Sequence, residues 1–588
     1  MRPSLYILAA GSALAISCQL PPTSKVDPGG VEPGPGASSG DGSTAAPSPT
    51  TSDGGTLAAS ERPDPMAARR AACAFKAGAR VTETLPLSES ERGAIPIRHV
   101  VVVMKENRSF DHLLGNLHAS GQPEVEAIPS TFANLDEEGA SVHPFALDTT
   151  CVNQDPGHQW AEMHRQVDDG AMDGFVFNGA DSTGGDGHFV MGTYAATDLP
   201  FYYWLANTFA LEDRHFPSVR SGTWPNRSFL LLGTADGVVC TFCGKIPKPT
   251  TPTLFDSLDR AGVTWGVFTD SNPFDGTLGW DGGHRGLHSF ADFQRALRDG
   301  TLPAVAFVDS VGWVEDEHPT ADVQVGENWT RLAYEAAVAS PLWPSLAMIW
   351  TYDEAGGFAD HVPPPNTACI ARPGNPDDTG FFELGVRVPL AVISPYARPH
   401  HVSHVVEDHT SITRFIEAVF GLPALTARDA NSPALLDMFD FQSPPALLHP
   451  PPAPLAGTGG CHGQLVLAPD EPSYVSALPM IIEIGFRGVA MPQETDRVGI
   501  FKYPRAATDV PSETNPIEPV AWSYIGGHGR TPGGAPTTGA VSIDATDLEP
   551  GATWPLAPGL WIVHYLPALA DGANGHTPAA SALLEVTP

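Results

Sequence analysis

Acidic and amide side chains follow two short apolar runs of this sequence. Glu106 and Asn107 come just after the first run, and Asp353 and Glu354 come directly after the second. In open α/β sheets, ligands bind beyond the carboxyl ends of the strands. Two acidic clusters at one sheet edge would repel each other unless a cation lay between them, and oxygen ligands suit a hard divalent ion. Either cluster alone is also typical of a solvated loop, but their shared position predicts a metal site.

A third segment places a hydroxyl group at the start of a predicted helix. Pro225 suits the first helical turn, so Thr223 is expected at the helix N-terminus. The helix dipole and free N–H groups there favour an anionic phosphate. A hydroxyl beside a cation can be activated as a nucleophile. Read alone, Thr223 is typical of an ordinary helix cap.

The elements that must position these residues alternate between strand and helix. Short continuous apolar runs predict buried parallel strands, and the segments between them show helical spacing. The predicted strands are His99–Met104, Val263–Phe268, Ala304–Val308, Leu346–Tyr352 and Val388–Ile393. The predicted helices are Leu254–Ala261, Phe290–Arg298, Trp329–Ala339 and Thr410–Phe420. This order predicts a doubly wound, mostly parallel α/β catalytic domain over residues 95–445.

The C-terminal part of the chain has a different pattern. Residues 446–470 are rich in Pro, Gly and Ala and are predicted to be a linker. Residues 471–588 show short strands separated by Gly/Pro turns, which predicts an all-β sandwich domain. Its predicted strands are Met480–Phe486, Val498–Tyr503, Val520–Tyr524, Ala540–Ile543, Leu560–Tyr565 and Ser581–Val586.

The N-terminal segment is typical of an export signal. Arg2 precedes the apolar stretch Leu5–Ser17, so residues 1–18 are predicted to be a signal peptide. Ala13-Leu14-Ala15 fits ordinary secretion, whereas Ala15-Ile16-Ser17-Cys18 resembles a bacterial lipobox. Lipidation of Cys18 would leave six of the seven cysteines, an even number that suits disulfides in an oxidising compartment. We therefore expect an exported protein, either a cell-envelope lipoprotein with membrane association through a lipid anchor or a secreted protein.

Composition excludes several classes of function. The formal net charge of −35 over 588 residues disfavours binding to nucleic acid or to anionic membranes through basic patches. Gly and Pro number 59 each, and residues 19–70 are rich in Gly, Pro, Ser and Thr, which predicts a disordered linker. The Cys240-Thr241-Phe242-Cys243 motif favours a structural disulfide over a redox pair or half a zinc site. No protein partner is implied.

Several motifs occur together and in order along residues 95–445. They are Glu106–His112 (ENRSFDH), Gly222–Arg227 (GTWPNR) and Tyr352–Val362 (YDEAGGFADHV), with supporting matches at 155–158, 172–175, 317–323 and 408–417. This set resembles the phosphoesterase family of bacterial and plant phospholipases C and related acid phosphatases. The resemblance implies an alkaline-phosphatase-like core.

The resemblance also implies roles for individual residues. It implies a divalent metal ion held by Glu106, Asn107, Asp353 and Glu354, with Thr223 as the nucleophile. His158 and His318 match histidines that contact phosphoryl oxygens or assist the leaving group. A further family histidine corresponds to His284 or His288, and the sequence leaves both open. Ala355 departs from the histidine often found there.

These implications favour one function and leave alternatives. We expect an exported, metal-dependent phosphoric ester hydrolase, a phospholipase C that cleaves phospholipid head groups through Thr223. The alternatives are an acid-phosphatase-type phosphomonoesterase acting on a small phosphate ester, and a non-catalytic surface lipoprotein. A sulfatase is disfavoured because threonine at position 223 cannot be converted to formylglycine.

Overall fold

The structure is a computed structural model. It describes residues 64–152, 154–183, 185–241, 252–270, 287–312 and 314–457, and shorter stretches between 466 and 587. The predicted signal peptide, nearly all of the 19–70 linker, His284 and Cys243 lie outside the described residues. Among the described helices, none has the length and apolar character needed to cross a membrane.

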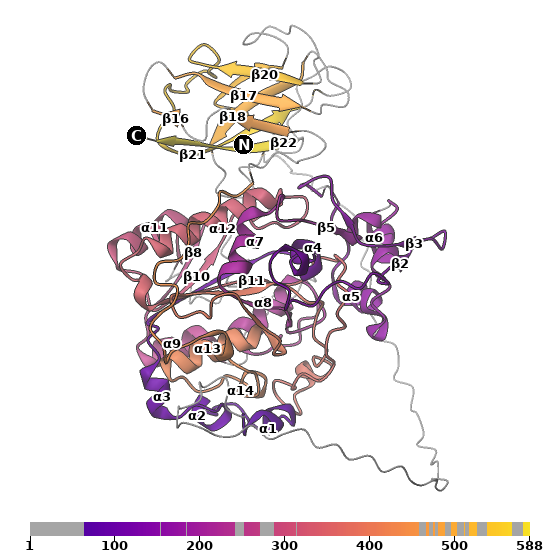
Figure 1. The fold of residues 1–588 in the computed structure, drawn as a ribbon, viewed down its shortest axis with the longest axis vertical. Coiled ribbons are helices and arrows are strands. Elements are labelled where there is room, and N and C mark those ends of the chain that lie inside the picture. Colours follow the sequence, from indigo (N-terminus) through magenta and orange to yellow (C-terminus); the bar gives the residue numbers. More distant parts are fainter. Residues whose placement is uncertain are drawn as a thin grey trace, which may run out of the picture. The chain divides into compact units, whose positions relative to one another are not determined.

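An eight-stranded sheet forms the centre of the α/β domain (Figure 1). Its strand order is β13-β6-β12-β11-β1-β10-β8-β9. The strands are β1 (His99–Lys105), β6 (Ala210–Glu212), β8 (Trp265–Thr269), β9 (Leu287–His288), β10 (Val305–Asp309), β11 (Leu346–Tyr352), β12 (Leu390–Ile393) and β13 (His401–Ser403). From β11 to β9, every neighbouring pair is parallel, so the predicted mostly parallel α/β fold is confirmed.

Strand β12 corrects one sequence-based expectation. The run Val388–Ile393 was expected to be parallel, but β12 pairs antiparallel with both β11 and β6. A strand buried on both faces has the same apolar sequence in either direction. Its direction depends on the connection, and only the short 3₁₀ helix η6 (Pro376–Asp378) lies between β11 and β12. A parallel return would need a crossover, usually a helix.

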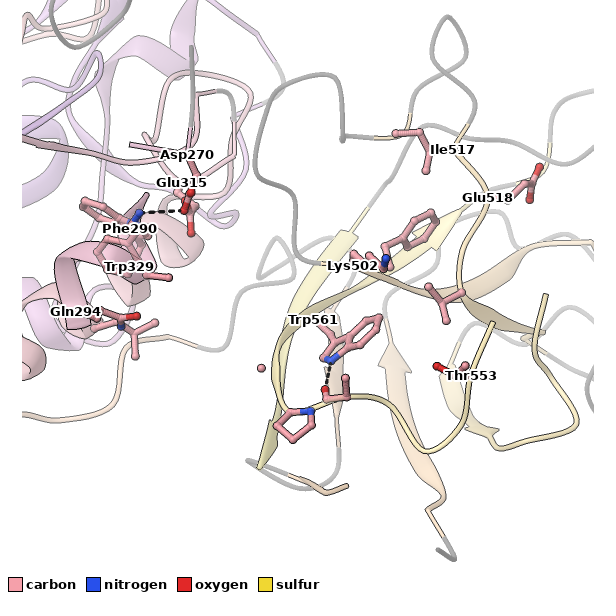
Figure 2. Close-up of a pocket in the computed structure, with 17 residues that line it drawn as sticks. Asp270, Phe290, Gln294, Glu315, Trp329, Lys502, Ile517, Glu518, Thr553 and Trp561 are labelled. Atoms are coloured by element: carbon pink, nitrogen blue, oxygen red, sulfur yellow. Dashed lines mark hydrogen bonds between the residues drawn. The ribbon is translucent and has the colours of Figure 1, made fainter. Parts of the chain in front are cut away.

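Helices cover both faces of this sheet (Figure 1). One face carries α7 (Pro200–Thr208), α11 (Phe290–Asp299) and α12 (Val323–Val338), and the other carries α8 (Thr223–Leu232), α9 (Leu254–Ala261) and α13 (His409–Phe420). Capping boxes start α9 at Thr253 and α11 at Ser289. Asp322 caps α12, which therefore begins six residues before the predicted start at Trp329. Figure 2 shows Phe290 beside Trp329, with ring centroids 4.9 Å apart.

The remaining elements of the α/β domain are short. The helices are α1 (Ala67–Ala71), α2 (Val81–Thr84), α3 (Glu89–Ala94), α4 (Phe110–Leu114), α5 (Trp160–Val167), α6 (Phe175–Thr183) and α14 (Ala427–Ala430). The minor strands are β2 (Asn134–Leu135), β3 (Ser141–Val142), β4 (Phe145–Ala146), β5 (Gly192–Thr193), β7 (His215–Phe216) and β14 (Glu407–Asp408).

Disulfide bonds tie distant segments together. Cys73, just after α1, is bonded to Cys369, which is 296 residues further along the chain. Cys151 and Cys240 each take part in a disulfide bond as well. A link between such distant residues restricts the unfolded chain and so stabilises the fold.

The C-terminal strands form two sheets, one ordered β15-β17-β20 and the other β16-β22-β21-β18-β19. Their bounds are β15 (Val466–Pro469), β16 (Tyr474–Val475), β17 (Ile482–Arg487), β18 (Arg497–Lys502), β19 (Ala521–Tyr524), β20 (Thr538–Ile543), β21 (Gly559–Leu566) and β22 (Ala580–Thr587). Buried side chains from both sheets, such as Ile484 and Val563, belong to one hydrophobic core. Figure 2 shows Trp561 of β21, whose indole N–H donates to the Ala557 carbonyl over 2.9 Å.

Candidate active site

Three neighbouring strands of the central sheet lead into acidic residues. β10 ends at Asp309, β1 is followed by Glu106, and β11 is followed by Asp353. Because β1 lies between β10 and β11 and is parallel to both, the three carboxyl groups reach one edge of the sheet. Asp353 Oδ1 accepts backbone N–H groups from Asn107 over 3.1 Å and from Glu354 over 2.8 Å. The structure therefore brings together the four residues predicted to hold a metal.

Helix α8 brings two side chains to one of these carboxyl groups. Thr223 is its first residue, and Arg227 lies one turn later on the same face. The Thr223 hydroxyl donates to Glu106 Oε2 over 3.3 Å, and Arg227 Nη2 donates to Glu106 Oε1 over 2.8 Å. Arg227 Nη1 also donates to Asp309 Oδ1 over 3.0 Å. Glu106 thus lies between a candidate nucleophile and a buried cation.

The start of α8 is capped without the Thr223 hydroxyl. The N-cap residue is Gly222, and the Trp224 N–H donates to Thr241 Oγ1 over 3.1 Å. The Asn226 amide donates to the Gly222 carbonyl over 3.1 Å, which fixes the turn that enters the helix. The predicted place of Thr223 at a helix N-terminus is confirmed, and its reading as an ordinary cap is wrong.

Negative charge outweighs positive charge at this sheet edge. Asp309 at the end of β10, Glu106 after β1, and Asp353 and Glu354 after β11 are all buried, and Arg227 pairs with Glu106 and Asp309. Among the described residues, Asn107 Oδ1, Asp353 Oδ2 and Glu354 Oε1 are buried without a hydrogen-bond partner. Unpaired buried polar groups are costly, and oxygen atoms of this kind are the ligands that hard divalent ions prefer. The residues therefore fit a divalent cation.

Burial and repulsion oppose the ionisation of two of these groups. Burial, followed by the neighbouring Glu106, raises the pKa of Asp353 well above its usual range. Burial, followed by Asp353, does the same to the pKa of Glu354. A cation between them would favour the charged forms of both carboxyl groups.

Two glycines after β11 allow the site loops to approach each other closely. Gly356 (φ 63°) and Gly357 (φ 77°) adopt left-handed conformations. A Cβ atom on Gly356 would lie 2.3 Å from the Asn107 carbonyl oxygen, and one on Gly357 would lie 2.9 Å from Pro156 Cβ. The Gly-Gly pair is therefore required for contact between the loop after β11 and the loops that carry Asn107 and His158.

His158 and His318 lie together, with ring centroids 5.7 Å apart. In each ring, Nδ1 donates to a backbone carbonyl of its own loop, over 2.7 Å and 2.6 Å. In the neutral rings Nε2 is therefore the nitrogen without a proton. His158 Nε2 lies 3.2 Å from Asn107 Nδ2 and 3.8 Å from Glu354 Oε1. Burial lowers the pKa of His318 to about 4, so its ring is uncharged near neutral pH.

Asp155 joins these two histidines to form a group whose side chains could hold a metal ion. Its Oδ1 lies 3.6 Å from His158 Nδ1, and its side chain is 39% exposed. The group borders the carboxylate site through the contact between His158 and Glu354. Side chains of the kinds that bind metal ions therefore lie on both sides of His158.

A second such group, Asp111, Asp360 and His361, is already paired with the guanidinium of Arg387. Arg387 Nη2 lies 2.8 Å from Asp111 Oδ1, and Arg387 Nε lies 3.1 Å from Asp360 Oδ2. His361 Nδ1 lies 2.7 Å from Asp111 Oδ2. Arg387 compensates the two carboxylates, and the group joins α4 to the loop after β11.

The other motif histidines lie outside the carboxylate cluster. His409 Nε2 donates to the backbone carbonyl of Asp353 over 2.7 Å, and burial lowers the pKa of His409 to about 4. His288 lies on β9, at the sheet edge three strands from β1, where it is exposed and stacks on Phe268. His409 therefore holds the backbone of the loop after β11 through the Asp353 carbonyl.

Sequence reasoning assigned no role to Arg227 or Asp309. Arg227 lies four residues after Thr223, a spacing that puts both on one helix face and could have indicated a shared partner. Asp309 follows an apolar run just as Glu106 and Asp353 do. Its position at the end of a predicted strand could have indicated a site residue in the same way.

Comparisons with known proteins assign the chain to a family. The model described as "Phosphoesterase family" matches residues 97–423, which is more than half of the chain. The chain belongs to this family and is a hydrolase that acts on phosphoric ester bonds. The alternative of a non-catalytic surface protein is therefore set aside.

Several phospholipases C are similar to it. Phospholipase C B of Mycobacterium tuberculosis (strain ATCC 25618 / H37Rv) is 33% identical over 448 residues, which cover 64% of this chain and 85% of the relative. Non-specific phospholipase C1 of Arabidopsis thaliana is 33% identical over 373 residues, 57% of this chain and 69% of the relative. A solved alkaline phosphatase superfamily protein from Vibrio parahaemolyticus is 11% identical, over 55% of this chain and 77% of that chain, with a TM-score of 0.29.

The raised pKa values predict how cation binding depends on pH. Without a cation, Asp353 and Glu354 keep protons in the folded state that the unfolded chain has lost. The stability that these protonated groups contribute at low pH is lost as pH rises through their folded pKa values. A divalent cation should remove that loss because it binds the ionised groups. We therefore expect the increase in melting temperature caused by Mn²⁺ to grow between about pH 5 and 8. Differential scanning calorimetry, with Na⁺ at matched ionic strength as control, measures it, and a pH-independent increase would contradict the expectation.

Proposed function

We propose that this protein is a metal-dependent phospholipase C that uses Thr223 as its nucleophile. The observation that supports this most directly is the 3.3 Å contact between the Thr223 hydroxyl and Glu106, beside buried oxygen atoms without partners. Relatives named as phospholipases C favour a phospholipid diester as substrate. The alternative substrate class is a small phosphate monoester.

Thr223 is positioned to give up its proton and attack phosphorus. Glu106 accepts the hydroxyl hydrogen bond, and the N-terminal end of α8 favours an anionic phosphate. A divalent ion held by Glu106, Asn107, Asp353 and Glu354 would, when bound, lower the pKa of a nearby hydroxyl and neutralise charge on the phosphoryl oxygens. Arg227 keeps Glu106 in place through its hydrogen bond to Oε1.

The reaction then has two displacement steps. In the first, Thr223 Oγ1 forms a bond to phosphorus while the bond from phosphorus to the leaving oxygen breaks. The hydroxyl proton passes to Glu106, and the leaving oxygen takes a proton from His158 in its protonated form. For a phospholipid, this step releases diacylglycerol and leaves the phosphorylated head group on Thr223.

In the second step, water displaces Thr223 from phosphorus. The His318 ring is uncharged near neutral pH and its Nε2 carries no proton, so this nitrogen can accept a proton from that water. Thr223 recovers its proton from Glu106, and the phosphorylated head group leaves. The proton on His318 then returns to His158, 5.7 Å away between ring centroids, through solvent.

Replacement of Thr223 tests the assignment of the nucleophile. Thr223→Ala should reduce turnover of phosphatidylcholine by about 10³-fold or more, because no other group can form the covalent intermediate. Thr223→Ser should retain measurable turnover. Ser228→Ala is the matched control: Ser228 is a buried hydroxyl of the same helix, and it donates to the Trp224 carbonyl over 2.7 Å. Wild-type turnover by Thr223→Ala would refute the assignment.

A substrate panel distinguishes diester from monoester hydrolysis. We expect higher kcat/KM for phosphatidylcholine than for p-nitrophenyl phosphate. The net charge of −35 should also favour zwitterionic over anionic head groups at low salt. Faster hydrolysis of the monoester would support the acid-phosphatase alternative, and a preference for anionic phospholipids would contradict this use of the charge.

We further propose that the protein is exported, with an alkaline-phosphatase-like catalytic domain and a C-terminal β-sandwich accessory domain. The apolar segment after Arg2 and the disulfide bonds of the α/β domain support export. We expect protein extracted from bacterial membranes to begin at Cys18 and to carry a diacylglyceryl group. Intact-mass analysis checks this, and an unmodified chain cleaved after Ala15 would indicate ordinary secretion.

A further inference from the structure

Three residues that directly precede site residues meet in one buried cluster. We call this the Lys105 cluster, made of Lys105, Glu317 and Tyr352. Each lies at 0% exposure. The residues that follow them in the chain are Glu106, His318 and Asp353.

The Glu317 carboxylate is the centre of the cluster. Lys105 Nζ lies 3.3 Å from its Oε1, the Tyr202 hydroxyl donates to Oε1 over 2.5 Å, and the Tyr352 hydroxyl donates to Oε2 over 2.6 Å. Lys105 Nζ also donates to the Glu315 and Gly326 carbonyls. Both carboxylate oxygens of Glu317 and the ammonium group of Lys105 are thereby held in place, away from water.

The cluster and the site lie on opposite faces of the sheet. Successive side chains of a strand point to opposite faces, so Lys105 and Glu106 diverge, as do Tyr352 and Asp353. Lys105 Nζ lies 5.0 Å from the ring centroid of Trp329, on α12, whereas Glu106 contacts α8. These two helices cover opposite faces (Figure 1). A change in the position of a cluster residue is therefore passed directly to the site residue that follows it in the chain.

The backbone of Glu317 is held in an unusual conformation. Its φ of 74° lies in the left-handed region, which is unfavourable for a residue other than glycine. Arg108 Nε donates to the Glu317 carbonyl over 2.8 Å. α12 leaves room for the side chain only because residue 326 is glycine: a Cβ there would lie 2.2 Å from Glu317 Cγ. The contacts of Glu317 therefore set the direction in which the chain continues to His318.

We propose that Lys105, Glu317 and Tyr352 are positioning residues that fix Glu106, His318 and Asp353 from the opposite face of the sheet. This inference rests on the proposed function of those three site residues. It goes beyond that function because it assigns a catalytic consequence to a charge pair that touches neither substrate nor metal.

Glu317→Gln tests the proposal, because it keeps the shape of the side chain but removes the charge that pairs with Lys105. The matched control is Glu417→Gln: Glu417 on α13 pairs with Arg414 over 2.6 Å, and both side chains are 0% exposed. We expect Glu317→Gln to lower kcat for phosphatidylcholine and affinity for Mn²⁺ by about 10-fold or more, with little change in KM. Glu417→Gln should lose comparable melting temperature but keep kcat and Mn²⁺ affinity within about twofold of wild type.

Gly326→Ala provides an independent test that changes no charge. The new methyl group should displace Glu317 and lower kcat and Mn²⁺ affinity as Glu317→Gln does. If both variants fold and match wild type in these two quantities, the cluster is merely structural and the proposal is overturned. Equal losses in Glu417→Gln would also overturn it.

Crystal structures of the Glu317→Gln and Glu417→Gln proteins separate this proposal from the proposed function. We expect the His318 ring to be displaced in the first variant and unmoved in the second. Should the wild-type protein hydrolyse no phospholipid, the proposed function fails, yet these structures still decide whether the cluster positions His318. An unmoved ring in Glu317→Gln contradicts the proposal whatever the substrate is.

Discussion

Repulsion among buried carboxyl groups is the constraint on which the rest of this structure depends. Three adjacent parallel strands deliver Asp309, Glu106 and Asp353 to one edge of the sheet, and Glu354 follows immediately. Arg227 is the one guanidinium among them in the described part of the chain. Buried carboxyl groups without a compensating positive charge would lose their protons only at high pH. If they were ionised at lower pH, their charges would destabilise the fold. A divalent cation at the proposed site would resolve this conflict and would also supply charge stabilisation for phosphoryl transfer.

The surrounding elements hold this unfavourable arrangement in place from several directions. α8 contributes Thr223 and Arg227 from one face of the sheet, and both contact the same carboxylate. On the other face, the Lys105 cluster fixes the residues that lead into the site. Two glycines after β11 remove the steric barrier between the loops. The Thr223 hydroxyl is thus aligned by parts of the chain that are far apart in sequence.

Sequence patterns predicted the strands and the four proposed ligands because both follow from local rules. Buried parallel strands have continuous apolar sequences, and site residues follow their carboxyl ends. The direction of β12 could not be predicted in this way, since a doubly buried strand has no directional signature. The ion pair between Arg227 and Asp309 and the pairing of Lys105 with Glu317 were also missed. Those contacts join residues 82 and 212 positions apart, and only the packed fold brings them together.

The most direct test of this account is to locate the cation itself. Crystals of the full chain soaked in Mn²⁺ should give an anomalous difference peak among Glu106, Asn107, Asp353 and Glu354, within about 2.0–2.6 Å of their oxygen atoms and next to the Thr223 hydroxyl. Absence of a peak there at saturating Mn²⁺ would contradict the account, as would a peak found only among Asp155, His158 and His318.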